Sequence, residues 1–230
     1  MTDRKNVFVL GMNDANRRRL EALPRAGEIA FHTLLRYEES HGARDYRIDD
    51  IHERARRRLQ EFDGPIHGII GFWDFPVSTM LPMLCDEFGL TGPTLESVLR
   101  CEHKYWSRVV QEEAVPEVTP RFAAVDPEDE QAIADLDLPY PFWLKPVKSF
   151  AGHLGFRIGG REDLEQALPR LREGLPRFSE PFQWVLDRAD LPPEIAERGA
   201  RLCVAEEIIG GWQCTVEGVV LGGDVHVHGI

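Results

Sequence analysis

The stretch FWLKPVKSFAGHLGF, residues 142–156, joins an apolar run to a loop of small residues. The run over 141–147 predicts a buried strand that contains a single charged residue, Lys145. Burying an ammonium group is costly unless an anionic partner lies nearby. We therefore interpret Lys145 as a phosphate ligand on a rigid strand; the alternative is a solvent-facing lysine on an edge strand, which Pro141 and Pro146 would permit.

The loop that follows, residues 148–155, supports the phosphate interpretation. Ser149, Gly152 and Gly155 are small, and backbone N–H groups of such a loop can surround phosphate oxygens. The segment matches neither the P-loop nor the dinucleotide fingerprint. Taken alone the loop is a weak signal for phosphate binding, because glycine-rich turns are common.

Upstream of residue 93, apolar runs alternate with helical patterns. This alternation predicts a parallel α/β sheet with crossover helices. Strands are expected at 6–12, 31–35 and 66–72, and helices at 14–23, 51–62 and 77–88, with Asp14 and Asp49 as N-caps.

Trp73 and Asp74 follow the third predicted strand directly. Open α/β sheets bind ligands at the carboxyl ends of their strands, so both residues are candidates for lining a substrate site. Asp74 either contacts substrate or caps the next helix, and the sequence leaves both interpretations open.

Downstream, Gly92-Pro93 interrupts the pattern and Thr94 is the expected cap of a helix that runs through residues 101–106. Residues 178–199 show little periodicity and are expected to form a long excursion with about one helical turn. The remaining predicted elements are strands at 121–125 and 156–158, helices at 127–136 and 161–173, and successive antiparallel hairpins from strands at 202–209, 213–220 and 225–230.

Composition limits the partners. The net charge of −12 opposes binding to nucleic acid or to anionic membrane surfaces. The sequence has neither a membrane-length apolar run nor a signal-peptide pattern at its start, so a cytoplasmic protein is expected. The four cysteines are not spaced as a zinc site, and a homo-oligomer remains open.

The succession of Lys104, FWLKPVKSFAGHLGF and CVAEEIIGGWQCTVEGVVLGGDVHVHGI resembles the ATP-grasp superfamily of carboxylate-amine or carboxylate-thiol ligases. The resemblance covers about residues 94–230. It implies an α/β and α+β chain with a Rossmann-like pre-ATP-grasp domain at 1–93 and an incomplete ATP-grasp domain at 94–230.

The resemblance also implies roles for individual residues. Lys104 corresponds to the first ATP-contacting lysine and Lys145 to the second, and Ser149–Gly155 corresponds to the mobile loop over the γ-phosphate. The remaining expected ATP-binding positions are Ser149, Gly152 and His153 in that loop, Glu206, Glu207, Ile208 and Ile209 in the adenine-binding hinge, and Gln213 where many relatives carry a ribose-binding glutamate.

The resemblance implies Mg²⁺ as well, but the family's ligands lie on strands that would follow Ile230, so the chain is expected to be truncated and inactive by itself. No metal ligand is assigned here. His226 and His228 share a strand face without a third ligand, and Glu217 is a candidate for the nucleotide or substrate cleft.

We therefore expect an ATP-dependent ligase that, when intact, activates an unidentified small carboxylate as an acyl phosphate for attack by an amine or another nucleophile. The alternative from another class is a non-catalytic ATP-binding regulatory module. A nicotinamide-dependent oxidoreductase is disfavoured because the opening strand lacks the glycine fingerprint.

Overall fold

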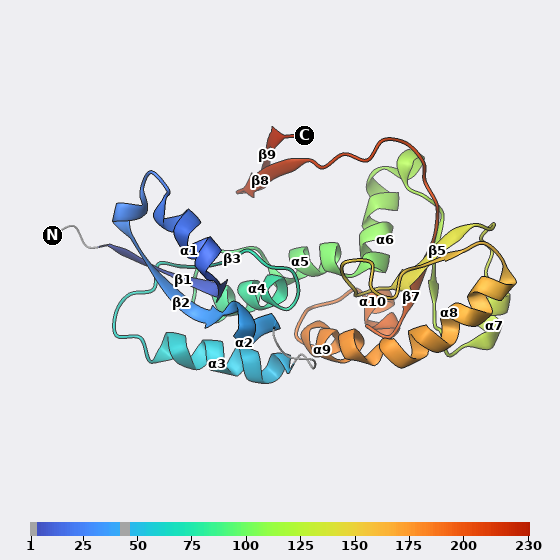
Figure 1. Cartoon of the computed structure of the whole chain (residues 1–230), viewed down its shortest axis with the longest axis horizontal. Helices are drawn as coiled ribbons and strands as arrows, with labels where there is room; N and C mark the ends of the chain where they lie inside the picture. Colours follow the sequence, from blue (N-terminus) through green and yellow to red (C-terminus); the bar gives the residue numbers. More distant parts are fainter. Residues whose placement is uncertain (1–3, 42–46) are drawn as a thin grey trace.

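The computed structural model describes residues 4–41 and 47–230 (Figure 1). Its strands form a three-stranded sheet in the order β2-β1-β3, a four-stranded sheet in the order β4-β7-β5-β6, and a separate β8-β9 hairpin. Figure 1 shows the two larger sheets at opposite ends of an elongated molecule, with α5 and α6 between them. None of the helices in the described residues could cross a membrane.

The front sheet is parallel, as predicted. It consists of β1 (Lys5–Met12), β2 (Ile29–Arg36) and β3 (Gly68–Gly71). Its connections contain α1 (Asp14–Glu21), the short 3-10 helix η1 (Ala26–Glu28), α2 (Tyr37–His41), α3 (Ile48–Gln60) and α4 (Val77–Glu87).

Both predicted aspartate caps in this half are wrong by one position or more. Asn13 caps α1, because its side chain accepts a hydrogen bond from the Asn16 N–H at 2.8 Å, and Asp14 is the first helical residue. Helix α3 begins at Ile48, so Asp49 lies inside its first turn. A carboxylate there still interacts favourably with the positive end of the helix dipole.

Two helices connect the sheets, where one was expected. Thr94 caps α5 (Leu95–Glu102) as predicted, accepting from the Ser97 N–H at 3.2 Å. The backbone then becomes extended at His103, and α6 (Lys104–Ala114) starts a new helix. The break places Lys104 at the first position of α6.

The second sheet is antiparallel and is covered by helices on its outer face. Its elements are η2 (Pro116–Val118), β4 (Phe122–Val125), α7 (Glu130–Ala134), β5 (Phe142–Pro146), β6 (Phe156–Ile158), α8 (Arg161–Gly174) and β7 (Cys203–Glu207). The excursion predicted for 178–199 is wrong, because α9 (Pro176–Leu186) and α10 (Pro193–Arg198) occupy most of it. Phe178, Phe182 and Val185 of α9 are buried at helical spacing.

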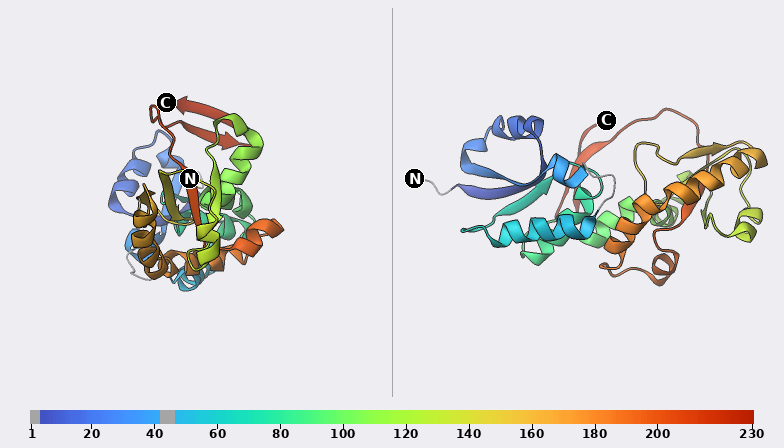
Figure 2. Two further views of the ribbon diagram at one scale, coloured as in Figure 1. Left: turned by 90° about the vertical axis from the view of Figure 1, so that its right-hand side faces the viewer. Right: turned by 60° about the horizontal axis from the view of Figure 1, so that its bottom comes forward.

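Of the successive hairpins predicted at the end of the chain, the last one forms, between β8 and β9, whereas the first is wrong because β7 does not pair with β8. Strand β7 lies between β4 and β5, and β8 (Glu217–Leu221) pairs with β9 (Asp224–Gly229). A segment over 208–216 leads away from β7 to this hairpin, which lies apart from both larger sheets in Figure 1 and in the left view of Figure 2. Its apolar side chains are exposed.

The apolar core runs through the junction between the two sheets. One buried cluster includes Leu10, Met80 and Leu99 together with Phe182 and Val204, so it joins the front elements to α9 and β7. A second cluster packs β5 and β7 against α8. The domain boundary at residue 93 stays a prediction, because this shared core extends across it.

Candidate nucleotide-binding site

A cavity of about 450 Å³ lies beside the second sheet, within the usual size range of ligand pockets. It brings together the strand lysine, the small-residue loop and the predicted hinge. Its lining residues are Arg108, Pro120, Trp143, Lys145, Gly152, Gly155, Glu206, Glu207 and Ile209.

Lys145 reaches the cavity from an interior strand. Strand β5 lies between β7 and β6, so the alternative of an edge-strand lysine is wrong. The Lys145 ammonium forms an ion pair with Glu206, which also accepts a hydrogen bond from Arg108 Nε at 2.9 Å. Glu206 is therefore the anionic partner that burial of Lys145 requires.

Lys104, the first residue of α6, lies beside the start of the 149–155 loop. Its backbone N–H donates to the Val147 carbonyl at 2.9 Å, and its Nζ donates to the Ser149 carbonyl at 2.6 Å. Burial, followed by repulsion from Lys145, lowers the pKa of Lys104 to about 8. The two predicted phosphate lysines are thus close enough to influence each other, with Lys104 near the start of the loop.

The loop itself has an unusual backbone. Ala151 and Leu154 adopt positive φ angles of 52° and 56°, which cost non-glycine residues free energy. Gly152, with φ of 71°, lines the cavity. The His153 ring packs edge-on against Phe178, with ring centroids 5.1 Å apart.

The predicted hinge is divided between sheet and cavity. Glu206 and Glu207 belong to β7, and the Glu207 N–H donates to the Arg121 carbonyl at 2.9 Å. Ile208 and Ile209 follow the strand, and Ile209 lines the cavity. Gln213 is exposed in the 208–216 segment outside the cavity lining, as is Glu217 in β8.

Lys148 is a buried residue of this region to which the sequence analysis gave no role. It is 3 % exposed, and its Nζ forms ion pairs with Glu102 and, at 3.5 Å, with Asp74. The sequence carried a signal for it: the chain has 23 arginines and only four lysines, and three of these lysines gather here.

Asp74 does not cap α4, whose N-cap position is Pro76. Its Oδ1 accepts from the Phe75 N–H at 2.8 Å and faces Lys148, while the side chain is 60 % exposed. The capping interpretation is therefore wrong, and the contact with substrate stays a prediction.

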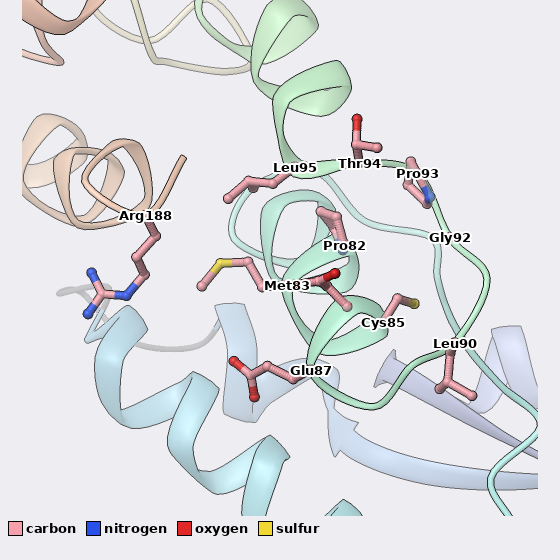
Figure 3. A pocket seen from close by; sticks show the side chains of 11 residues that line it. Pro82, Met83, Cys85, Glu87, Leu90, Gly92, Pro93, Thr94, Leu95 and Arg188 are labelled. Carbon is pink, nitrogen blue, oxygen red and sulfur yellow. The ribbon is translucent and has the colours of Figure 1, made fainter. Parts of the chain in front are cut away.

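A larger cavity, of about 570 Å³, lies away from these residues, between α4, the 88–95 connection and Arg188 (Figure 3). Figure 3 labels Arg188 and Glu87 among its lining side chains. None of the predicted ATP-binding residues lines it.

Magnesium ligands are not evident. Within residues 4–41 and 47–230, no group of three or more histidine, cysteine or acidic side chains could hold a metal ion. Mg²⁺ is ordinarily held by one or two carboxylates together with waters and nucleotide phosphates, an arrangement that does not require such a group.

The fold is that of the ATP-grasp ligases. An L-amino acid ligase from Bacillus licheniformis superposes with a TM-score of 0.59 at 21% identity, covering 98% of this chain and 50% of that one. The VanG D-Ala:D-Ser ligase from Enterococcus faecalis gives a TM-score of 0.60 at 12% identity, covering 98% and 68%.

A carboxyaminoimidazole ribonucleotide synthase from Aspergillus clavatus, solved with ATP, gives a TM-score of 0.55 at 16% identity, covering 99% and 53%. This chain thus spans about half to two thirds of the length of these structures. No family model and no curated protein sequence matches it.

Proposed function

We propose that the chain binds ATP in the 450 Å³ cavity and, within its whole protein, serves a ligase that activates a carboxylate. The observation that carries this proposal is the convergence of Lys145, Arg108 and the 149–155 loop on one cavity, with Lys104 at the loop entrance. Positive side chains and loop N–H groups are the groups that bind phosphate oxygens.

ATP would compete for a lysine ammonium that is already paired with a carboxylate. Lys145 contacts Glu206, and a phosphate oxygen would compete with that carboxylate for the ammonium. Trp143 shares a strand face with Lys145, so it offers an apolar surface to the base together with Ile209. The Glu207 N–H already donates to the Arg121 carbonyl. The backbone groups of Ile208 and Ile209 would therefore recognise the adenine edge.

The proposed reaction has two steps. A carboxylate oxygen attacks the γ-phosphorus, the bond to the ADP oxygen breaks, and an acyl phosphate forms. An amine or another nucleophile then attacks the carbonyl carbon, loses a proton and displaces inorganic phosphate. The protein's contribution is mainly to position the reactants and to neutralise charge on the phosphates through Lys104, Lys145 and Arg108. Mg²⁺ is proposed only as the counter-ion that ATP brings with it.

Competition among nucleotides tests the binding part. If the cations contact the terminal phosphates, affinity should fall from ATP to ADP to AMP, and Lys145→Met should remove most of that preference. Equal affinities for ATP and AMP in the parent chain would contradict the proposed orientation.

Trapping with hydroxylamine tests the chemistry in the whole protein. An acyl phosphate reacts with hydroxylamine to give a hydroxamate, so a panel of acids should yield ATP-dependent hydroxamate for the true substrate. Tight ATP binding without hydroxamate or ADP release across the panel would favour the regulatory module instead.

A further inference from the structure

The buried Lys148 ammonium connects elements from both halves of the molecule. Its Nζ contacts Glu102 at the end of α5 and lies 3.5 Å from Asp74, which follows β3. The rings of Phe75 and Phe182 lie 5.2 and 5.8 Å from it. Because it is 3 % exposed, this charge depends on its protein partners rather than on water.

The Glu102 carboxylate extends the same network to α4. Its Oε1 accepts a hydrogen bond from Ser78 Oγ at 2.5 Å, while Oε2 faces Lys148. The Lys148 side chain therefore joins α4, α5 and the turn after β3.

The backbone beside Lys148 is the entrance to the loop. Val147 donates to the Leu202 carbonyl and accepts from the Lys104 N–H, both at 2.9 Å. On the other side, the Ser149 carbonyl accepts from Lys104 Nζ at 2.6 Å. Contacts that fix Lys148 therefore also fix the Val147 and Ser149 carbonyls, which accept hydrogen bonds from Lys104.

We propose that Lys148 is a positioning residue of the nucleotide site, which anchors the entrance of the 149–155 loop to Glu102 and Asp74 and thereby orients Lys104. Lys148 is absent from the cavity lining, so it acts through its neighbours rather than on nucleotide. The orientation of phosphates rests on the proposed function, whereas the anchoring of the loop does not.

Hydrogen exchange without nucleotide tests the anchoring. Lys148→Met should speed amide exchange in residues 149–155 and in the first turn of α6, and leave β1 and β3 unchanged. Lys5→Met, which removes an exposed lysine, is the matched control and should match the parent throughout. Unchanged exchange in the loop of folded Lys148→Met would overturn the proposal.

A second variant covers the case in which Lys148→Met does not fold. Glu102→Gln keeps the lysine and removes its nearest counter-charge, so the same two segments should exchange faster, with the rest unchanged. Parent-like loop exchange in Glu102→Gln would then overturn the proposal.

A double-mutant cycle with Mg-ATP tests the action through Lys104. Lys148→Met should weaken Mg-ATP binding about tenfold in the parent and less than about twofold in Lys104→Ala. Equal losses in both backgrounds would overturn a role through Lys104, since a general structural defect would act in both. A parent chain that fails to bind Mg-ATP would refute the proposed function, while the exchange result would still decide whether Lys148 anchors the loop.

Discussion

At the scale of single residues, most charges of the site are paired with one another. Lys145 and Arg108 share Glu206, and Lys148 is held between Glu102 and Asp74. Among the described hydrogen bonds, the Lys104 Nζ donates only to the Ser149 carbonyl and hydroxyl. Lys104 is therefore the cation whose charge depends most on a ligand.

Proton uptake should accompany ATP binding because of Lys104. Burial and Lys145 lower its pKa to about 8, Asp74 and Glu206 oppose this, and bound phosphates would raise the pKa again. Near pH 8 we expect uptake of about half a proton per ATP, and almost none near pH 6.5. Calorimetry in buffers of different ionisation enthalpy measures it.

Lys104→Arg is the control, since arginine stays protonated and should bind ATP without this uptake. Identical uptake in the parent and in Lys104→Arg would contradict the assignment.

The lowered pKa of Lys104 also makes the stability of the fold depend on pH. The unfolded chain holds the Lys104 proton up to about pH 10.5 and the folded chain only to about 8, so this group makes stability rise with pH between those values.

Glu206→Gln should change stability and ligand response in opposite directions. Removing the carboxylate leaves Lys145 and Arg108 facing each other, which should lower the free energy of unfolding by about 2 kcal/mol. Nucleotide phosphates would replace the lost charge, so the rise in thermal midpoint on adding Mg-ATP should exceed that of the parent. Thermal melts with and without Mg-ATP measure both, and an equal rise would argue against phosphates near Lys145.

Sequence patterns predicted a common site for Lys145 and the loop, which line one cavity, but not the partners of these residues. A lone lysine in an apolar strand predicts an anion nearby, yet it cannot say that the anion is Glu206 on β7, 61 residues away. The assignment of Lys148 depends likewise on Glu102 and Asp74, which only the tertiary structure brings to it.

At the scale of elements, the break between α5 and α6 sets the position of Lys104. His103 is buried at the break, and its Nδ1 accepts from the Trp106 N–H at 3.2 Å. Its Nε2 lies 3.1 Å from the Gly199 carbonyl, which requires a proton on Nε2. Periodicity alone could not reveal this break, because both helices continue one apolar pattern.

His103→Ala should lower the free energy of unfolding by about 3 kcal/mol, since it removes a helix cap and a buried hydrogen bond. His103→Asn should recover part of this, because its amide oxygen can cap α6. Urea unfolding measures both, with exposed Cys101→Ser as the control expected to stay near the parent. Equal midpoints for His103→Ala and the parent would contradict the structural role.

The length of α9 was also beyond sequence inference. Pro181 lies inside the helix, and prolines ordinarily disfavour interior helix positions. Burial of Phe178 and Phe182 outweighs that preference here. Local propensity was thus overridden by packing that involves distant residues.

At the scale of the whole molecule, the parallel front sheet and the last hairpin were predictable, and the position of β7 in the second sheet was not. Alternating strands and helices specify a parallel sheet, whereas nothing local places β7 between β4 and β5. The β8-β9 hairpin is left with exposed apolar side chains, including Val219, Val220 and Val225.

The exposed hairpin should make the chain self-associate. Val220 and Val225 are register partners in the hairpin, so Val220→Lys with Val225→Glu places opposite charges across the strands and replaces apolar surface. Sedimentation velocity should show less concentration-dependent association for this double variant than for the parent. A parent that stays monomeric across the concentration range would contradict the expectation.

The central claim is that the cavity beside Lys145 binds ATP, and calorimetric titration of Mg-ATP tests it most directly. The parent chain should bind, Lys145→Ala should lose at least about tenfold in affinity, and Lys5→Ala should bind like the parent. Absence of binding by the folded parent, or equal binding by Lys145→Ala, would contradict the claim.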